Sequence, residues 1–326
     1  ERRVTKPIVI LDVHWRKVSE LFSTHDLNVL HDKYHVVWGK DAPIQQDLLD
    51  ATLPNAFAYV AANPNVSKET LETTLAKREK EIDFKIGDHY IFSKSMEKNY
   101  TEKFLKLPNI WSDFVVERLN NLHTMPVDEN YDQIVFGCFV TLRKVNDLVI
   151  KLWSKVLNQF QNTKIYFKAA ELNDIDIEKK IKEKFLNNGI SSDRLILEKS
   201  SDYKSYLQAY SKIHITLDTF PFNGVTTSFE SIWMGVPIFC LKGSNLPYSR
   251  CSYSINKNLK MNDWIANDEN DYLAKLERIL LNKKELLFIK KNLRERAIEN
   301  NLFNSKKFTE NLANILNQTW KDFTVG

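Results

Sequence analysis

Short apolar runs alternate with segments of helical spacing along the first third of the chain. The runs at 7–11, 34–38 and 57–61 have the length and composition of β-strands. The segments that follow them are predicted to be helices, at 15–23, 43–53 and 67–80. Because strands that alternate with helices pair side by side in one direction, this region predicts a parallel sheet.

The same alternation returns after a less regular stretch that covers about residues 81–130. Five further strands are predicted, at 133–139, 164–168, 194–198, 213–217 and 236–241. The helices between them are predicted at 147–159, 175–188, 203–210 and 227–234, and charged amphipathic helices end the chain. Gly235 and Pro237 mark the end of the last of these four helices and the start of the strand after it.

The two alternating regions predict an α/β protein with two Rossmann-like lobes, arranged as in the GT-B fold. An N-terminal flavodoxin-like lobe is expected over 1–80 and a linker region over 81–130. The C-terminal lobe, 131–326, is expected to be a doubly wound parallel sheet with terminal helices. The length of 326 residues suits two domains better than one.

Composition excludes several classes of protein. No run approaches the roughly 18 apolar residues of a membrane span, and no apolar signal region follows the charged N-terminal residues, so a cytoplasmic location is expected. The net charge of +4 is mild, and the lysines are interleaved with acidic residues, so no nucleic-acid partner is expected. None of the eight glycines forms a GxGxxG or Walker loop, which argues against a dinucleotide enzyme and a P-loop NTPase.

Cysteine and acidic spacing predict neither a disulfide framework nor a metal site. Cys138, Cys240 and Cys251 form no CxxC pair, and the first two lie within apolar runs, which indicates buried thiols. Asp174-Ile175-Asp176 has the DxD spacing of metal-dependent transferases. It also opens a predicted helix, so we interpret Asp174 as a helix cap.

The segment 217–237 has the strand–loop–helix order of a phosphate site. A strand ends at Leu217, an Asn223-Gly224 loop follows, and a helix starts near Thr226. A helix N-terminus offers N–H donors and partial positive charge to a phosphate, and a glycine lets it come close. Thr226 and Thr227 add hydroxyl donors.

Glu230 lies one turn into the same helix, where its carboxylate can accept both hydroxyls of a ribose. A purely structural interpretation has equal weight. Thr227 and Glu230 have the TxxE spacing of a capping box, in which the glutamate only satisfies a backbone N–H.

The order Leu-Asp-Thr, Asn-Gly-x-Thr-Thr, acidic residue and Trp-x-Gly-x-Pro within 217–237 resembles the diagnostic motif of the O-GlcNAc transferase-like (SPINDLY-type) family. The strand and turn at 136–144 resemble the family segment that carries an essential lysine, which places that role on Lys144. Residues 104–111 and Ser249-Arg250 also match, so the resemblance covers about residues 81–326.

This resemblance implies inverting, metal-independent transfer from a UDP-sugar to a protein or another acceptor, without a cofactor. Lys144 would stabilise charge on the leaving diphosphate, and Asn223, Gly224, Thr226, Thr227 and Glu230 would bind the donor. Tyr206 stands where many members have a histidine near the uracil, so it could stack on the base or simply pack its helix. Val225 replaces a histidine of animal members, which removes one phosphate donor.

The first 75 residues do not resemble the family. They resemble, weakly, the N-terminal part of D-2-hydroxyacid dehydrogenases, and the 326 residues contain none of the repeats that often deliver protein acceptors. His14, directly after the first strand, is a candidate base or a structural strand-end histidine. Two alternatives to a transferase therefore stay open: a nucleotide-sugar-binding module with little or no catalysis, and an oxidoreductase.

Overall fold

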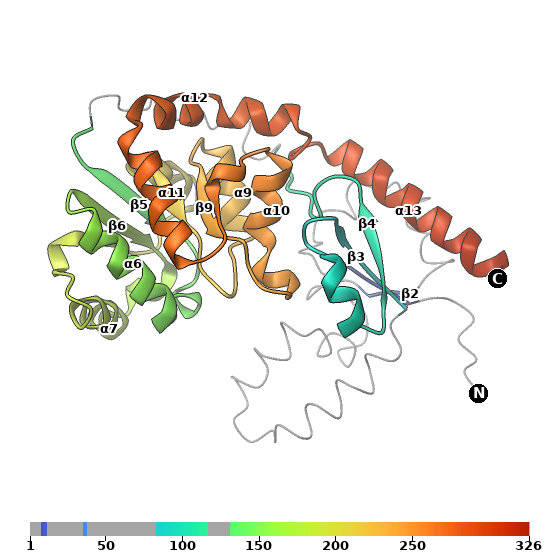
Figure 1. Ribbon diagram of the computed structural model, residues 1–326, viewed down its shortest axis with the longest axis horizontal. Coiled ribbons are helices and arrows are strands. Elements are labelled where there is room, and N and C mark those ends of the chain that lie inside the picture. Colours follow the sequence, from blue (N-terminus) through green and yellow to red (C-terminus); the bar gives the residue numbers. More distant parts are fainter. Residues whose placement is uncertain (1–7, 12–34, 38–82, 117–130, 326) are drawn as a thin grey trace, which may run out of the picture. The chain divides into compact units, whose positions relative to one another are not determined.

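The computed structural model describes residues 8–11, 35–37, 83–116 and 131–325. The chain divides into two compact units, of which one contains 1–115 and 304–326 and the other 116–303 (Figure 1). The third strand expected at 57–61, the helices expected before residue 81, and His14 lie outside the described residues.

The described part of the first unit contains a parallel sheet in the order β2-β1-β3-β4. Its strands are β1 (Ile8–Leu11), β2 (His35–Val37), β3 (Phe84–Asp88) and β4 (Lys103–Leu107). The first two confirm the strands predicted at 7–11 and 34–38.

Residues 81–130 were expected to form a linker region, but they contribute two strands to this sheet. The side chains of Phe84 and Ile86 alternate with the less buried Lys85 along β3. A short helix connects β3 to β4, and the side chain of Met96 in this helix is fully buried. Both runs are short, and β3 pairs with β1 across more than seventy residues, so local spacing does not reveal this part of the sheet.

The C-terminal helix α13 (Ser305–Val325) also belongs to the first unit, although the second lobe was expected to extend to residue 326. Phe308, Leu312 and Leu316 are buried at four-residue intervals along α13, and the helix packs against β4. The Ser305 hydroxyl donates to Asp113 Oδ1 at 2.9 Å at the start of the helix.

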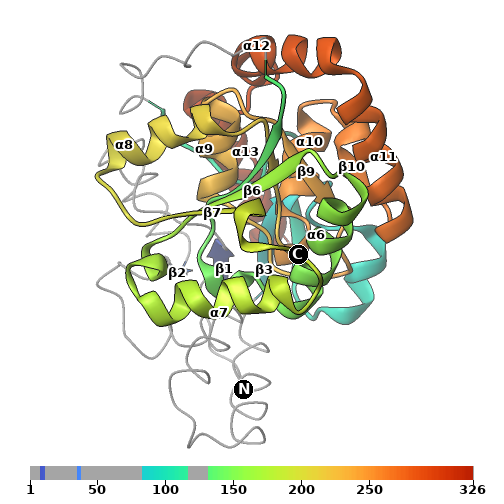
Figure 2. The same cartoon turned by 90° about the vertical axis from the view of Figure 1, so that its left-hand side faces the viewer.

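The second unit is a six-stranded parallel sheet in the order β10-β9-β8-β5-β6-β7 (Figure 2). Its strands are β5 (Ile134–Cys138), β6 (Thr163–Lys168), β7 (Leu195–Glu198), β8 (Ile215–Leu217), β9 (Ile238–Leu241) and β10 (Ile265–Ala266). The connecting helices are α6 (Asp147–Gln159), α7 (Ile175–Leu186), α8 (Tyr203–Gln208), α9 (Thr226–Trp233) and α10 (Cys251–Asn258), followed by α11 (Glu269–Leu281) and α12 (Lys283–Glu299).

This strand order confirms the predicted doubly wound sheet. The chain runs outward from β5 to β7 and then returns to β8 on the other side of β5, so the winding reverses between β5 and β8. In Figure 2, α8 and α9 lie on one side of the sheet, and α6 and α11 lie on the other. Ligands of such sheets bind outside the carboxyl ends of the strands at the point of reversal.

Local sequence signals explain where these elements begin. Asn146 caps α6 by accepting hydrogen bonds from the N–H groups of Leu148 and Val149, and Trp153 in the same helix is fully buried. Asp174 caps α7 by accepting from the Asp176 N–H at 2.9 Å, which confirms the capping role predicted for the DxD spacing. Cys138 and Cys240 are buried, as predicted, Cys251 is buried as well, and none of the three forms a disulfide.

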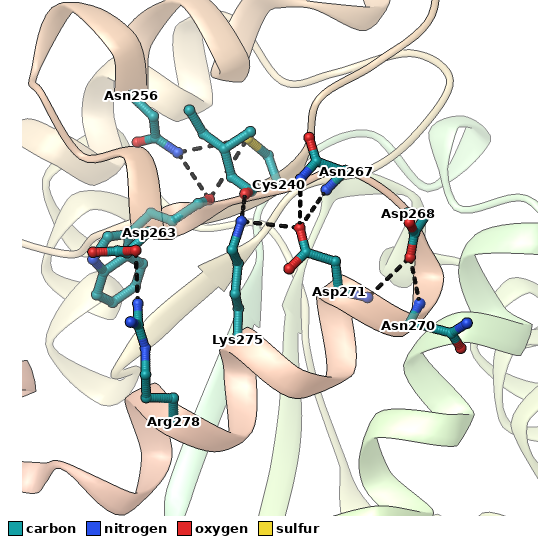
Figure 3. A network of polar contacts seen from close by, with 11 residues as sticks. Cys240, Asn256, Asp263, Asn267, Asp268, Asn270, Asp271, Lys275 and Arg278 are labelled. Atoms are coloured by element: carbon teal, nitrogen blue, oxygen red, sulfur yellow. Dashed lines mark hydrogen bonds and ion pairs between the residues drawn. The ribbon is translucent and has the colours of Figure 1, made fainter.

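Beyond β9, the two-residue strand β10 is fixed by side chains rather than by its own length (Figure 3). Lys275 of α11 donates to the Ile265 carbonyl at 2.7 Å and pairs with Asp271 at 2.9 Å. The Asn267 backbone and side-chain N–H groups both donate to Asp271 at 2.8 Å, and Asp268 caps α11. The sequence pattern predicted no strand here, because two apolar residues are too short a signal.

Among the described residues, the structure contains no helix that meets the length and hydropathy needed to cross a membrane.

Candidate functional site

Two loops meet at the carboxyl ends of β5 and β8, where the sheet reverses. The first loop carries Lys144 and the second carries Asn223, 79 residues later. The Lys144 ammonium donates to the Asn223 carbonyl at 2.7 Å and lies 4.3 Å from the centre of the Phe222 ring. The structure therefore brings together two of the site residues that the sequence predicted.

Lys144 is a half-buried cation. Burial lowers the pKa of its ammonium group below the usual 10.5, and the carboxylate of Asp218 is the main charge that opposes this effect. The face of the Phe222 ring carries negative electrostatic potential, so it also favours the cation. These contacts hold a positive charge at the rim of the sheet without a surface ion pair.

Asp218 organises the loop between β8 and α9. It is only 3% exposed, and its Oδ1 accepts from the Thr219 N–H at 3.0 Å and the Gly224 N–H at 2.8 Å. Burial raises the pKa of this carboxyl group to about 6, although these hydrogen bonds oppose the rise. Asp218 was part of the recognised motif, but the sequence assigned it no role. Its place directly after a buried strand was the available signal.

Helix α9 begins at Thr226 without a side-chain cap, and Val225 is its N-cap residue. The N–H groups of Ser228 and Phe229 donate to the Val225 carbonyl. The N–H groups of Thr226 and Thr227 precede these bonds, so both point out of the helix end as donors. Thr226 is exposed and Thr227 is half-buried.

Gly224 lies where the loop passes over the start of α9. A Cβ atom at this position would come within 2.7 Å of Ser228 Oγ and 2.8 Å of Thr227 Oγ1. Real Cβ atoms do not approach other atoms this closely, so a side chain at position 224 would force these hydroxyl groups or the loop to shift. Glycine therefore lets the loop pass close to the first turn of α9 without such a shift.

Glu230 does not form the capping box that was the alternative interpretation. Its carboxylate is 4% exposed and accepts hydrogen bonds from the hydroxyl groups of Tyr203 and Tyr206, each at 2.9 Å. Burial raises the pKa of Glu230 to about 6, and the two tyrosine hydrogen bonds oppose the rise. Each carboxylate oxygen has a second lone pair, so it can still accept from a ligand hydroxyl. The sequence did not predict Tyr203.

Tyr206 also contributes to the wall of a cavity of about 280 Å³ beside this cluster. The cavity lies at the carboxyl ends of β5, β6 and β7, and its lining includes Phe139, Thr141, Lys168, Glu171, Ser201 and Tyr206. The buried Lys168 ammonium pairs with Glu198 at 2.7 Å. Sequence spacing gave no sign of this cavity, because its walls come from four separate segments.

The free energy of unfolding of Glu230→Gln, relative to that of the parent, is expected to increase as the pH rises. Because the pKa of Glu230 is about 6 when folded and 4.5 unfolded, the folded state binds this proton more tightly. Ionisation therefore costs stability, and that cost develops between about pH 4.5 and 6. Gln removes it, so the stability difference between Glu230→Gln and the parent should grow in favour of the variant by about 1 kcal/mol from pH 5 to 7.

Thermal melts across this pH range measure the effect. Glu198→Gln is the matched control, because the pKa of Glu198 is lowered to about 2 by its hydrogen bonds to Lys168 and Lys212. Glu198 is ionised in both states above pH 5, so its variant should differ from the parent by a constant amount. A constant difference for Glu230→Gln as well would contradict the prediction.

Among the described residues, no group of three His, Cys, Asp or Glu side chains is placed to hold a metal ion. His14, the candidate base, lies outside the described part of the chain. The remaining predicted residues, from Lys144 to Glu230, all lie at the same end of the second sheet.

A family model described as glycosyl transferase family 41 matches residues 80–312, which is most of the chain. The chain is 25% identical over 247 residues to a Solanum lycopersicum protein named "Probable UDP-N-acetylglucosamine–peptide N-acetylglucosaminyltransferase SPINDLY", a match that covers 75% of this chain and 26% of the relative. It is 23% identical over 255 residues to the Arabidopsis thaliana protein SEC, with 73% and 25% covered. The chain thus spans about a quarter of the length of these curated relatives.

Solved structures with the same fold include a mutant of the Thermobaculum terrenum O-GlcNAc transferase. The TM-score is 0.68 at 19% identity, and the match covers 97% of this chain and 68% of that one. A sucrose-phosphate synthase from Thermosynechococcus elongatus matches with a TM-score of 0.52 at 14% identity, covering 91% and 71%. The GT-B fold expected from the sequence is confirmed.

Proposed function

This chain belongs to glycosyl transferase family 41, and on that premise we propose that it transfers a sugar from a UDP-sugar to a protein acceptor. Its curated relatives are named for the transfer of N-acetylglucosamine from UDP-N-acetylglucosamine to peptides, so that donor is the first to test. One observation carries the proposal: the Lys144 ammonium, on the loop after β5, donates at 2.7 Å to the Asn223 carbonyl, which lies on the loop that leads into the uncapped start of α9.

The diphosphate of the donor is proposed to bind at this helix end. The N–H groups of Thr226 and Thr227 donate to it, their hydroxyl groups add further donors, and the helix dipole favours negative charge here. Gly224 lets the loop pass close to these groups without a clash. Lys144 stands on the neighbouring loop and supplies a full positive charge to this proposed arrangement.

The nucleoside is proposed to occupy the cavity at the ends of β5, β6 and β7. Its volume of about 280 Å³ suits a pyrimidine base with its ribose. Tyr206 belongs both to the cavity wall and to the Glu230 cluster, so a base in the cavity would place its ribose near this carboxylate. Glu230 is then the acceptor for the ribose hydroxyls.

The transfer is proposed to be inverting and independent of a metal ion. The acceptor oxygen attacks the anomeric carbon of the sugar, a new C–O bond forms on one face, and the bond to the diphosphate breaks on the other. Negative charge develops on the leaving diphosphate, where Lys144 and the α9 amides stabilise it. The acceptor proton passes to a base, for which His14 remains our candidate from the sequence.

A thermal-shift panel followed by a transfer assay tests this function. UDP at 100 times its dissociation constant should add about 2.7 kcal/mol of stability, and ADP at the same concentration should add much less. UDP-N-acetylglucosamine mixed with a peptide library should then release UDP and give glycosylated peptide. Equal shifts by UDP and ADP would contradict the proposed donor site. UDP binding without any release or transfer would contradict the proposed reaction.

A further inference from the structure

We infer that Asp218 is a positioning residue that holds Lys144 in place and in its charged form through the single peptide group between Asn223 and Gly224. This inference rests on the proposed function for its catalytic meaning. The contacts between Asp218, the Asn223–Gly224 peptide and Lys144 lie within the protein, so they can be tested without a donor sugar.

The geometry of one peptide group carries the argument. Its N–H, from Gly224, donates to Asp218 Oδ1 at 2.8 Å, and its carbonyl, from Asn223, accepts from Lys144 Nζ at 2.7 Å. A carboxylate and an ammonium thus bind the two ends of the same amide dipole. Each contact polarises the amide in the direction that strengthens the other.

The loop itself is fixed on both sides of this peptide. The Asn223 side chain donates to the Thr219 carbonyl at 2.8 Å, and the Asn223 N–H donates to the Tyr248 carbonyl at 3.1 Å. Asp218 Oδ1 also accepts from the Thr219 N–H. The Asn223 carbonyl therefore has a defined direction, and the flexible lysine side chain ends on it.

Asp218 also provides charge that Lys144 needs. Among the described residues, the titratable groups that act on Lys144 are Asp218 at the end of β8, Cys138 of β5 and Cys251 of α10. Burial raises the pKa of Cys138 to about 12, so this thiol is neutral near pH 7. Asp218 is the one carboxylate among these groups. Its own carboxyl is faced by Lys144 and by the Ser252 hydroxyl, which both favour its ionised form.

Asp218→Asn removes the negative charge of the side chain and keeps an acceptor for the hydrogen bonds from the Thr219 and Gly224 N–H groups. Both backbone N–H groups donate to Oδ1, and an asparagine keeps an oxygen at that position. The variant should retain the loop and its melting transition, and lose only the negative charge. The pKa of Lys144 should then fall by about one pH unit, a tenfold rise in its acid dissociation constant.

The pKa of Lys144 can be measured on the ligand-free chain by competitive acetylation with acetic anhydride and mass spectrometry of the Lys144 peptide. Glu171→Gln is the matched control, because it removes a carboxylate that follows the neighbouring strand β6 and is not among the groups acting on Lys144. Its Lys144 should titrate as in the parent. An unchanged Lys144 pKa in folded Asp218→Asn would overturn the inference.

A second measurement does not require Asp218→Asn to fold. In the parent protein, the Lys144 ¹³Cε resonance should move with a midpoint near pH 6, where Asp218 titrates. Glu230 titrates near the same pH, so the inflection must persist in Glu230→Gln. Its loss there would assign the effect to Glu230 and overturn the role of Asp218. Failure of UDP to bind would instead refute the proposed function and leave both titrations interpretable.

Discussion

Lys144→Ala is expected to lower the turnover of a UDP-sugar by roughly 10²–10³-fold, while its affinity for the donor changes by no more than about threefold. A fixed positive charge contributes most where charge develops in the transition state, so its loss reduces kcat more than it raises KM. The Asn223 carbonyl loses its 2.7 Å partner in this variant, but the bonds from Asp218 and Thr219 to the loop remain. Steady-state kinetics with UDP detection, together with calorimetric UDP binding, separate the two quantities.

Arg143→Ala provides the matched control for Lys144→Ala. Arg143 is the neighbouring cation in the same short helix, and its side chain is exposed. Its removal should leave turnover within about twofold, because an exposed charge is screened by solvent and salt. If both variants lose activity equally, the effect reflects the net charge of the rim. Full activity of Lys144→Ala would remove Lys144 from the reaction.

Gly224→Ala is expected to weaken UDP binding by roughly 10- to 100-fold, equivalent to about 1.4–2.8 kcal/mol. The new Cβ would meet Ser228 Oγ at 2.7 Å and Thr227 Oγ1 at 2.8 Å, so these hydroxyl groups, the loop or the start of α9 must shift. Each of these shifts changes the proposed set of phosphate donors, because Thr227 contributes both its hydroxyl and its N–H to that set. Isothermal titration with UDP measures the loss directly.

A second glycine distinguishes lost binding from lost stability. Gly189 has a φ of +81°, and its nearest neighbouring atom would be 3.9 Å from an added Cβ. Gly189→Ala should therefore cost about 1 kcal/mol of stability through backbone strain and leave the affinity for UDP unchanged. If Gly224→Ala binds UDP normally, the donor phosphates do not use this helix end.

Much of the second unit could be predicted from the sequence, because its signals are local. Helix α6 was predicted with its observed limits, 147–159, since its cap and its apolar spacing lie within one short segment. Gly235, with a φ of +77°, ends the turn after α9 as its position before Pro237 suggested. Strand ends differed by one or two residues, where hydrogen bonding to neighbouring strands sets the limit.

The parts that could not be predicted depend on contacts between distant segments. The Glu230 carboxylate binds Tyr203 and Tyr206, which are 27 and 24 residues away, whereas the alternative capping box needed only a spacing of three. The capping-box interpretation was therefore available from the sequence, whereas the observed hydrogen bonds from the two tyrosines were not. Asp218 acts through Gly224 across a loop whose shape depends on Tyr248, and no spacing rule encodes that arrangement.

The return of α13 to the first unit means that the second unit is an insertion within it. The backbone passes between the units twice, near residues 115 and 303. A protease that cuts at one crossing leaves the two units covalently joined through the other, so a single nick releases no domain. Cleavage at both crossings yields a fragment of about 116–303. That fragment carries Lys144, Asp218, Gly224 and Glu230 together, so limited proteolysis offers a way to isolate the whole candidate donor site as one continuous polypeptide.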